Sequence, residues 1–318
     1  MDREPNNIEA LVGKGDHRSA VGDERAAAAF YKAALRAAQV LGQLPASLKP
    51  AIDRAVQGVA QAERSFRDHQ ERSLAQSGFA EGDRPFRFQQ ALDILAGRLE
   101  ARLDLQRPTS FYYPGLPQRR YFESSEFGWA QAIESAADAI HTELTAELAN
   151  GGEGFAPYLV NDLNRPRQDF HGLHDNPEWS TFQLWEKGQP SPLAERFPRT
   201  LAAVQAVDMP HITVRAPNIL FSKLGSGARI PPHHGMLNTR LVCHLPLIVP
   251  PGCGFRVGGE TRQWKEGKLL IFDDTIEHEA WNDGPSDRII LIFDAWRPEL
   301  KTDERGAVTA LFEAVDSY

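Results

Sequence analysis

Histidines are concentrated in one part of this sequence. The run HHGMLNTRLVCH holds His233, His234 and His244, and His278 follows it further along the chain. A neutral imidazole nitrogen binds iron, zinc and copper near pH 7, and histidine is the commonest protein ligand for such metals. A single histidine in a strand is more often a hydrogen-bonded polar group than a ligand, so it is the clustering that indicates a metal site.

The motifs of common hydrolases are absent. His278 begins HEAWN, in which Asn282 stands where the helical H-E-x-x-H zinc motif has its second histidine. No G-x-S-x-G nucleophile motif occurs, and LGSGAR is too short to be a phosphate or dinucleotide fingerprint. Asp273 and Asp274 are neighbours, and neighbours in a strand face opposite sides, so a turn-capping role is favoured over shared acid–base work.

An iron oxygenase fits the histidines better. Non-haem iron(II) oxygenases commonly hold the metal with two histidines and one carboxylate, and two of these ligands often form an H-x-[DE] pair. In this sequence Gly235 stands two residues after His233, where the carboxylate would be, and glycine has no side chain to act as a ligand. The site would therefore hold iron through His233 and His278 alone, with water or another small ligand in the vacant position.

Composition limits the possible partners. The chain has 318 residues, a 42% hydrophobic content and a formal net charge of −8, which predicts a folded globular protein of about two domains. No block rich in lysine and arginine stands out, so neither nucleic acid nor an anionic membrane is expected as the main partner. The start MDREPNNIEA lacks an apolar core, and no stretch approaches the roughly 18 apolar residues of a spanning helix. We expect a cytoplasmic protein without membrane insertion, in which Cys243 and Cys253 are reduced thiols.

Residues from about 5 to 105 have the periodicity of helices, with apolar residues three and four positions apart. A fourth helix is expected after Asp83 and Pro85, which suit a helix start. The expected apolar stripes of three helices are Phe30, Ala33, Ala34, Ala37 and Leu41; Ile52, Ala55, Val59, Ala62 and Phe66; and Phe88, Leu92, Leu95 and Leu99.

The opening pair of segments, IEALVGKGDHRSA and ERAAAAFYKAALRAA, resembles a tetratricopeptide helix hairpin. Small residues stand where two helices would touch, and a Gly-Asp pair lies near the turn. The match covers about one repeat, whereas such arrays need about three repeats to bury a continuous core. We therefore expect a helical domain of tetratricopeptide-like character, and an alanine-rich bundle is the alternative.

A turn-rich stretch, RPTSFYYPGLPQRRYF, separates this half from the next. Beyond it, one amphipathic helix is expected around residues 129–144. Residues 154–198 are irregular and rich in Pro, Asp and Asn, which predicts a long structured loop. After His211 the period changes to two, beginning with Ile212, Val214 and Ala216. The expected strands are ILFSKL, RLVCHLPLIV, GFRVGG, TRQW, KLLIFDD, HEAWN and RIILIFDAW, which together indicate a sandwich or barrel.

The strand-rich half resembles a known family. The stretch from FSKLGSGARIPPHHG to FDAWRPEL is similar to the aspartyl/asparaginyl β-hydroxylase family of iron(II)- and 2-oxoglutarate-dependent dioxygenases, above all in the blocks H-x-G…N…H-L-x-L and FDD-x-x-E-H-x-x-W-N. The family's iron site lacks the carboxylate ligand, which agrees with Gly235. The resemblance implies a double-stranded β-helix over residues 108–318, after the tetratricopeptide-like helical domain over residues 1–107. The expected fold class is therefore α+β.

The resemblance also implies roles for individual residues. His233 and His278 match the two iron ligands at the catalytic centre. Arg288 matches the arginine that pairs with the distal carboxylate of the co-substrate 2-oxoglutarate, and Ser222 matches a hydroxyl that shares this carboxylate. His244 matches a histidine near the carboxylate next to the keto group.

Arg288 makes chemical sense in this role. A guanidinium offers a bidentate fork to a carboxylate and remains charged in a barrel interior. Arg288, Ile290 and Ile292 face the same side of their strand, so the charge would end an apolar inward row. Without the resemblance, a surface pair with Asp287 or Asp283 would be an equal alternative.

One position departs from the family. In several members an arginine two residues before the His244 equivalent contacts the inner carboxylate of the co-substrate, whereas this chain has Val242. Arg240, Val242 and His244 share a strand face. Arg240 is therefore expected either to reach the gap or to bind a substrate carboxylate, and the effect of Val242 on 2-oxoglutarate binding is left open.

The implied reaction is hydroxylation of an unactivated C–H bond with molecular oxygen. Trp264, Trp281 and Phe293 are candidates to line the pocket, although aromatic strand residues are more often core. The helical half favours a peptide or protein substrate, and the resemblance implies the β-carbon of Asp or Asn as the hydroxylated position. A free amino acid or small acid and a lipid acyl chain are the alternatives. Two rival classes are a catalytically inactive binding or scaffold protein and a cupin-like zinc or nickel protein.

Overall fold

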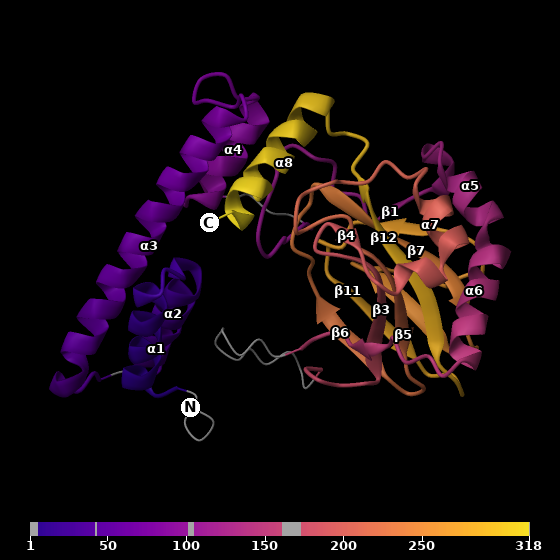
Figure 1. Cartoon of the computed structure of the whole chain (residues 1–318), viewed down its shortest axis with the longest axis horizontal. Coiled ribbons are helices and arrows are strands. Elements are labelled where there is room, and N and C mark those ends of the chain that lie inside the picture. Colours follow the sequence, from indigo (N-terminus) through magenta and orange to yellow (C-terminus); the bar gives the residue numbers. More distant parts are fainter. Residues whose placement is uncertain (1–5, 42, 101–104, 161–172, 318) are drawn as a thin grey trace. The chain divides into compact units, whose positions relative to one another are not determined.

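The computed structural model describes residues 6–41, 43–100, 105–160 and 173–317 (Figure 1). The chain divides into two compact units, the first built mainly from residues up to Ala80 and the second from residues 81–159 and 175–316. Residues 81–107, which the sequence analysis assigns to the helical domain, are grouped with the second unit. Where an independently folding domain begins remains a prediction.

The first unit is a stack of helices. Asn7 and Asp23 cap the first two helices by accepting hydrogen bonds from backbone N–H groups. Tyr31 packs between two glycines, because a Cβ at Gly15 or Gly58 would lie only 2.5 or 2.3 Å from its ring. The predicted helix hairpin is confirmed, while its tetratricopeptide-like character remains a prediction. The elements are α1 (Ile8–Ala20), α2 (Glu24–Val40), η1 (Ala46–Leu48) and α3 (Lys49–Gln76).

The second unit contains two antiparallel sheets. The eight-stranded sheet has the order β1-β10-β7-β12-β5-β3-β2, with β4 paired to β3, and the four-stranded sheet has the order β6-β11-β8-β9. The bounds in the larger sheet are β1 (Tyr121–Phe122), β2 (Ala156–Pro157), β3 (Trp179–Glu186), β4 (Gln189–Pro190), β5 (Ile219–Leu224), β7 (Arg240–Ile248), β10 (Leu270–Phe272) and β12 (Arg288–Trp296). Those in the smaller sheet are β6 (Arg229–His233), β8 (Cys253–Val257), β9 (Glu260–Arg262) and β11 (His278–Asn282).

The strand order identifies the fold. From β5 to β12 the chain passes back and forth between the sheets, giving β5-β12-β7-β10 in one and β6-β11-β8-β9 in the other. This is the eight-stranded arrangement of a jelly roll or double-stranded β-helix. The predicted α+β class and β-helix are therefore confirmed, and the strands expected from β5 to β12 all form.

The larger sheet has two different faces. One packs against short helices through side chains such as Phe221, Leu245 and Leu291, and Figure 1 shows these helices along one side of the strands. Because side chains alternate along a strand, Ser222, His244 and Arg288 face the opposite way, into the barrel. The covering helices are α5 (Ala130–Ser135), α6 (Ala137–Ala149) and α7 (Pro198–Val204).

The remaining helical elements lie at other places in this unit. The chain enters the unit through one helix, and a longer one follows the last strand. The first helix precedes the barrel in sequence and the second follows it, and the two are in contact with each other. They are α4 (Phe86–Leu95) and α8 (Thr302–Asp316), with the 3-10 turns η2 (Ser124–Glu126) and η3 (Ala194–Arg196) elsewhere in the unit.

The structure corrects the prediction of a long loop over residues 154–198. Within the described part of that range, β3 forms an eight-residue strand beside β5. Phe182 and Leu184 of β3 join the core beneath the helices, while Trp179 and Thr181 are buried on the barrel side. Burial on both faces removes the alternation of polar and apolar residues by which such a strand is recognised.

Three smaller expectations also fail. Ile212 and Ala216 form only an isolated bridge, and Val214 between them is exposed with a φ of 57°, so residues 212–216 form no strand. The fourth helix ends at Leu95 rather than reaching Leu99, because Gly97 has the positive φ of 69° typical of a helix end. The single helix expected over residues 129–144 is interrupted between α5 and α6, although its apolar stripe continues through both.

Candidate active site

His233 and His278 lie side by side in the smaller sheet. His233 ends β6, His278 begins β11, and the two residues are direct partners in the antiparallel ladder. Their ring centroids are 4.1 Å apart. The sequence-predicted pair is thus brought together, with both rings on the same face of the sheet.

Hydrogen bonds fix the tautomer of both rings. His233 Nδ1 lies 2.8 Å from the Pro231 carbonyl oxygen, and His278 Nδ1 lies 3.0 Å from that of Ile276. A carbonyl oxygen can only accept, so each Nδ1 carries the proton and each Nε2 keeps its lone pair, as in metal-binding histidines. Burial lowers the pKa of His233 and places the pKa of His278 well below its ordinary value. Both imidazoles are therefore neutral near pH 7.

Gly235 leaves room for another residue's carboxylate. A Cβ built on Gly235 would lie 2.0 Å from Oδ2 of Asp274. A side chain at residue 235 is thus excluded by Asp274, which lies in the place that an H-x-[DE] carboxylate would need. Among the residues that the structure describes, no group of three or more His, Cys, Asp or Glu side chains could hold a metal ion. The described donor set is the histidine pair.

Asp274 belongs to a buried charge cluster. Its Oδ2 lies 3.1 Å from Nη2 of Arg240, and Nη1 of the same guanidinium lies 3.2 Å from Oδ1 of Asp294. All three side chains are at most 16% exposed. Burial raises the pKa of Asp274 to about 6, against the opposing effect of Arg240.

Arg288 is a buried cation of a different kind. It is 1% exposed, its guanidinium lies 4.9 Å from the ring centroid of Trp264, and its Nε has no hydrogen-bond partner within the described structure. Burial lowers its pKa to about 10. The alternative of a surface pair is wrong, because Asp287 pairs with Lys223 and Asp283 with Arg229.

Ser222 and His244 complete the inward row. Ser222 is paired with Ile290 of β12, two residues from Arg288 on the same face. His244 Nδ1 lies 3.3 Å from the indole Nε1–H of Trp264, which can only donate, so the proton of His244 is on Nε2. Burial, helped by the charge of Arg288, places the pKa of His244 well below its ordinary value. His244 therefore offers an uncharged N–H donor.

Two of the aromatic candidates lie elsewhere. Phe293 packs against Trp129 in the core on the helix-covered face of the sheet. Trp281 stands on the face of β11 opposite to His278, against Gly254. Only Trp264 lines the interior, where it touches the residues just described.

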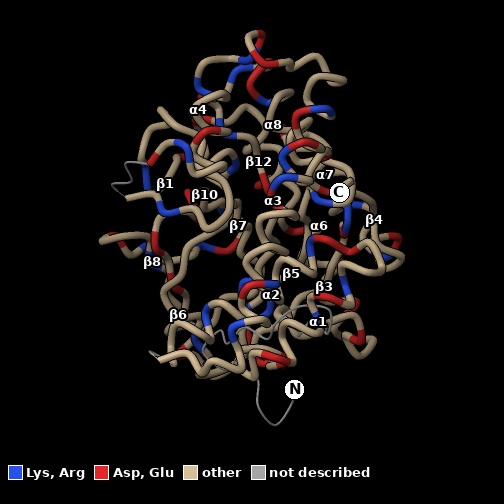
Figure 2. The backbone as a smooth tube through the Cα atoms, turned by 90° about the vertical axis from the view of Figure 1, so that its left-hand side faces the viewer, with Lys and Arg blue, Asp and Glu red and all other residues tan. Residues whose placement is uncertain are grey.

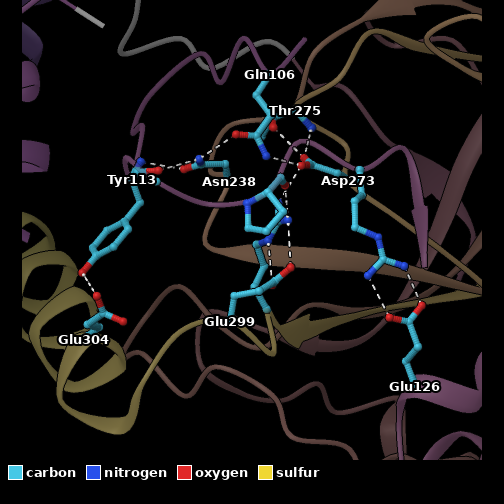
Figure 3. Close-up of polar contacts among 12 residues, drawn as sticks. Gln106, Tyr113, Glu126, Asn238, Asp273, Thr275, Glu299 and Glu304 are labelled. Carbon is cyan, nitrogen blue, oxygen red and sulfur yellow. Dashed lines mark hydrogen bonds and ion pairs between the residues drawn. The ribbon is translucent and has the colours of Figure 1, made fainter. Parts of the chain in front are cut away.

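A buried network holds the loop between β10 and β11, which leads to Asp274 and His278 (Figure 3). Asp273 accepts hydrogen bonds from Gln106 Nε2 at 2.5 Å, from Arg297 Nη1 at 2.7 Å and from the backbone and hydroxyl of Thr275. Asn238 Nδ2 in turn donates to Gln106 Oε1. The turn-capping role predicted for Asp273 and Asp274 is confirmed for Asp273 and wrong for Asp274, which pairs with Arg240 instead.

Sequence reasoning missed two aromatic residues beside the histidines. Tyr158 packs on Trp179 with ring centroids 4.7 Å apart, and Trp179 lies 6.5 Å from the His233 ring. Tyr158 is 43% exposed, yet the charges of Arg240 and Asp294 affect the pKa of its hydroxyl. Recognition of β3 as a strand would have pointed to Trp179.

Comparison with known proteins identifies the family. A family model described as aspartyl/asparaginyl beta-hydroxylase matches residues 134–298, about half of the chain, and this range contains both histidines. The chain belongs to this family. It is therefore related to hydroxylases, and membership indicates an enzyme.

Three relatives show the extent of the similarity. The human aspartyl/asparaginyl beta-hydroxylase is 39% identical over 200 residues, covering 62% of this chain and 25% of the relative. Human aspartate beta-hydroxylase domain-containing protein 2 is 30% identical over 218 residues, covering 67% of this chain and 57% of the relative. Ornithine lipid ester-linked acyl 2-hydroxylase from Rhizobium tropici is 34% identical over 197 residues, covering 61% and 66%. The chain thus spans about a quarter of the first relative and less than two thirds of the second.

Two further observations bear on partners. None of the described helices combines the length and apolar character needed to cross a bilayer. Figure 2 shows lysine and arginine interleaved with aspartate and glutamate along the chain, in keeping with the net charge of −8.

Proposed function

We propose that this chain is an iron(II)- and 2-oxoglutarate-dependent dioxygenase that hydroxylates a C–H bond, with the β-carbon of Asp or Asn in a peptide or protein as its target. The observation that carries the proposal is the histidine pair. His233 and His278 are adjacent and neutral, His278 is buried and His233 is partly buried, and each presents the Nε2 lone pair from a ring fixed by a backbone carbonyl. Borderline metals such as iron(II) are well suited to such ligands.

The residues present fit 2-oxoglutarate as the second component. Arg288 is a buried guanidinium without a carboxylate partner, and its Nε lacks an acceptor in the described structure. Burying such a cation costs free energy unless a bound anion pairs with its charge and accepts its hydrogen bonds. Ser222 adds a hydroxyl on the same face, and His244 adds a neutral N–H nearer to the histidine pair. A dicarboxylic acid would be held at one end by Arg288 and Ser222 and at the other by His244.

When bound, iron(II) with 2-oxoglutarate supplies oxygen activation for C–H hydroxylation. The chain's own residues orient and enclose the reactants. Trp264 packs over Arg288 and donates to His244 Nδ1, so it fixes the proton of His244 on Nε2, which would donate to the co-substrate when it is bound. Trp264 and Phe255, with ring centroids 5.4 Å apart, also exclude water from this end of the barrel.

A lipid acyl chain is a second candidate substrate. It is favoured by the 34% identity to ornithine lipid ester-linked acyl 2-hydroxylase, which is close to the 39% identity to the human aspartyl/asparaginyl enzyme. Identity at this level does not separate the two substrate classes. The assay below includes both.

The proposal is tested by 2-oxoglutarate turnover. The full chain is incubated with iron(II), ascorbate and 2-oxoglutarate, together with either a peptide pool or an ornithine-lipid dispersion, and succinate and a gain of one oxygen are measured. We expect stoichiometric succinate and oxidised peptide. Oxidised lipid alone would move the substrate to the second candidate, and no succinate in either case would contradict the proposal.

Arg288 gives a matched pair of variants. Arg288→Gln should raise the KM for 2-oxoglutarate about a hundredfold, since a buried charge-assisted hydrogen bond is worth about 3 kcal/mol. Arg229→Gln removes an exposed guanidinium that pairs with Asp283 and should leave the KM unchanged. An unchanged KM in Arg288→Gln would exclude this residue from co-substrate binding.

A further inference from the structure

The two ends of the inward-facing row differ in charge balance. On β7 the barrel-facing residues are Arg240, Val242 and His244, and their partners on β12 are Trp296, Asp294 and Ile292. Arg288 lies beyond His244 on the same face, near the other end of β12. The row therefore has an arginine at each end, with Val242 and His244 between them.

The Arg288 end is short of negative charge. No carboxylate forms an ion pair with Arg288 among the described contacts, and its Nε lacks an acceptor. A ligand that brings a carboxylate to this end supplies the negative charge and the hydrogen-bond acceptor that the Arg288 guanidinium lacks. This is the end that the proposed function gives to 2-oxoglutarate.

The Arg240 end has the opposite balance. Among the residues that the structure describes, the guanidinium of Arg240 faces two buried carboxylates, those of Asp274 and Asp294, so this cluster carries one more negative than positive charge when both are ionised. Val242, beside Asp294, adds no cation. Oδ1 of Asp274 is buried without a hydrogen-bond partner in the described structure, so it is an acceptor that lacks a donor.

This end lies next to the histidine pair. The charge of Arg240 contributes to the lowered pKa of His278, whereas the charge of Arg288 contributes to the lowered pKa of His244. Asp274 rests against Gly235, two residues after His233. The Tyr158 hydroxyl is close enough to Arg240 and to both carboxylates for their charges to affect its pKa. A substrate carbon that approaches the histidines therefore brings its polar substituent to this cluster.

We propose that the polar group admitted beside the reacting carbon is a neutral carboxamide rather than a carboxylate, so that asparaginyl residues are preferred to aspartyl residues. This inference rests on the proposed function and narrows its substrate. A carboxylate would be the third buried negative charge around one guanidinium, which costs free energy in a medium of low dielectric constant. A carboxamide adds no charge, and its N–H can donate to Oδ1 of Asp274. Arg240, which the sequence resemblance offers to a substrate carboxylate, is instead ion-paired with the chain's own carboxylates. Its Nη1 has no hydrogen-bond acceptor in the described structure, so it can donate to the oxygen of the carboxamide.

The test compares retention of two peptide libraries. Both have identical randomised flanks, and one has Asn and the other Asp at the fixed central position. Immobilised full-length protein is loaded with Mn(II) and 2-oxoglutarate, and the retained peptides are measured by mass spectrometry. We expect the Asn library to be retained about tenfold more strongly. A tenfold difference in affinity corresponds to about 1.4 kcal/mol, and the repulsion free energy of one buried like-charge contact exceeds this value.

Two variants show whether the charge cluster causes the preference. Asp294→Asn removes one negative charge and should narrow the preference to about threefold or less. The control Asp208→Asn removes a carboxylate that pairs with Arg305 on the surface and should leave the preference unchanged. Equal narrowing in both variants would contradict a local cause.

The outcomes separate this inference from the proposed function. Loading of Mn(II) and 2-oxoglutarate is first measured by metal analysis and calorimetry, and failure to load rejects the proposed function and this inference with it. If the protein loads, equal retention, stronger retention of the Asp library or retention of neither library overturns the inference alone. Stronger retention of the Asn library, lost in Asp294→Asn, supports it.

Discussion

At the residue scale, Gly235 matters because of what replaces its side chain. The carboxylate of Asp274 lies against its Cα, and the same carboxylate pairs with Arg240. Glycine at residue 235 predicts that this position supplies no ligand, but the group that fills the space belongs to Asp274, a residue distant in sequence. The pairing of Arg240 with two carboxylates was likewise not predictable, because it joins side chains from separate strands and a loop.

Gly235→Ala tests this close approach. The added Cβ should displace the Asp274 carboxylate from Arg240 and lower kcat/KM about tenfold, the effect of an overpacking cost of about 1–3 kcal/mol. Steady-state turnover of 2-oxoglutarate measures the change. The control is Gly259→Ala, because a Cβ there would meet nothing within 4 Å. Full activity in Gly235→Ala would show that Asp274 is not held by this contact.

At the element scale, α8 is attached through its first turn. Glu304 accepts hydrogen bonds from Arg87 Nε and Nη2 of α4 at 2.7 and 2.6 Å and from the Tyr113 hydroxyl at 3.0 Å. Although burial opposes it, these bonds lower the pKa of Glu304 below its ordinary value of 4.5. The lower pKa means that the stabilisation is present above pH 4.5 and is lost as the pH falls through the folded-state pKa.

Glu304→Gln should therefore lower the free energy of unfolding by about 2–3 kcal/mol at pH 7. The difference from the natural chain should shrink as the pH falls below 4.5, as measured by urea unfolding at several pH values. Asp303→Asn, at the exposed neighbouring position, should cost less than about 1 kcal/mol. A difference between Glu304→Gln and the natural chain that is independent of pH would show that ionisation of Glu304 is not its origin.

The elements differ in how far the sequence predicts them. Apart from β6, the strands from β5 to β12 are recognisable because turn residues separate short runs rich in β-formers. β6 has two prolines in its five residues, RIPPH, and was not among the predicted strands. β3 escapes because both its faces are buried. The apolar spacing of Ala307, Val308, Leu311 and Phe312 is typical of a helix, so the signal for α8 was available in the sequence. Gln106 offers no such signal, since its role exists only once Asp273 is folded beside it.

At the scale of the whole molecule, the second unit includes residues that precede the barrel. Arg87 of α4 binds Glu304, and Gln106 donates to Asp273 next to the candidate site. Both lie before residue 108, where the sequence analysis begins the β-helix domain. The contacts of the second unit thus start well upstream of its first strand.

Two fragments test where the folding unit begins. A fragment of residues 81–318 should fold cooperatively and bind iron(II) and 2-oxoglutarate. A fragment of residues 108–318 lacks Arg87 and Gln106, so its free energy of unfolding should be lower by about 2–5 kcal/mol because buried partners are left unpaired. Urea unfolding and calorimetry compare the two. Equal stability would place the boundary at residue 108, as the sequence predicts.

The most direct test of the candidate site is the iron content of three proteins loaded under anaerobic conditions. The natural chain and His234→Ala should each bind one iron(II) per chain with similar affinity, because His234 lies outside the ladder pair that His233 and His278 form. His278→Ala leaves a single imidazole and should lose specific iron binding. Iron retained by His278→Ala, or lost by His234→Ala, would contradict a centre formed by His233 and His278.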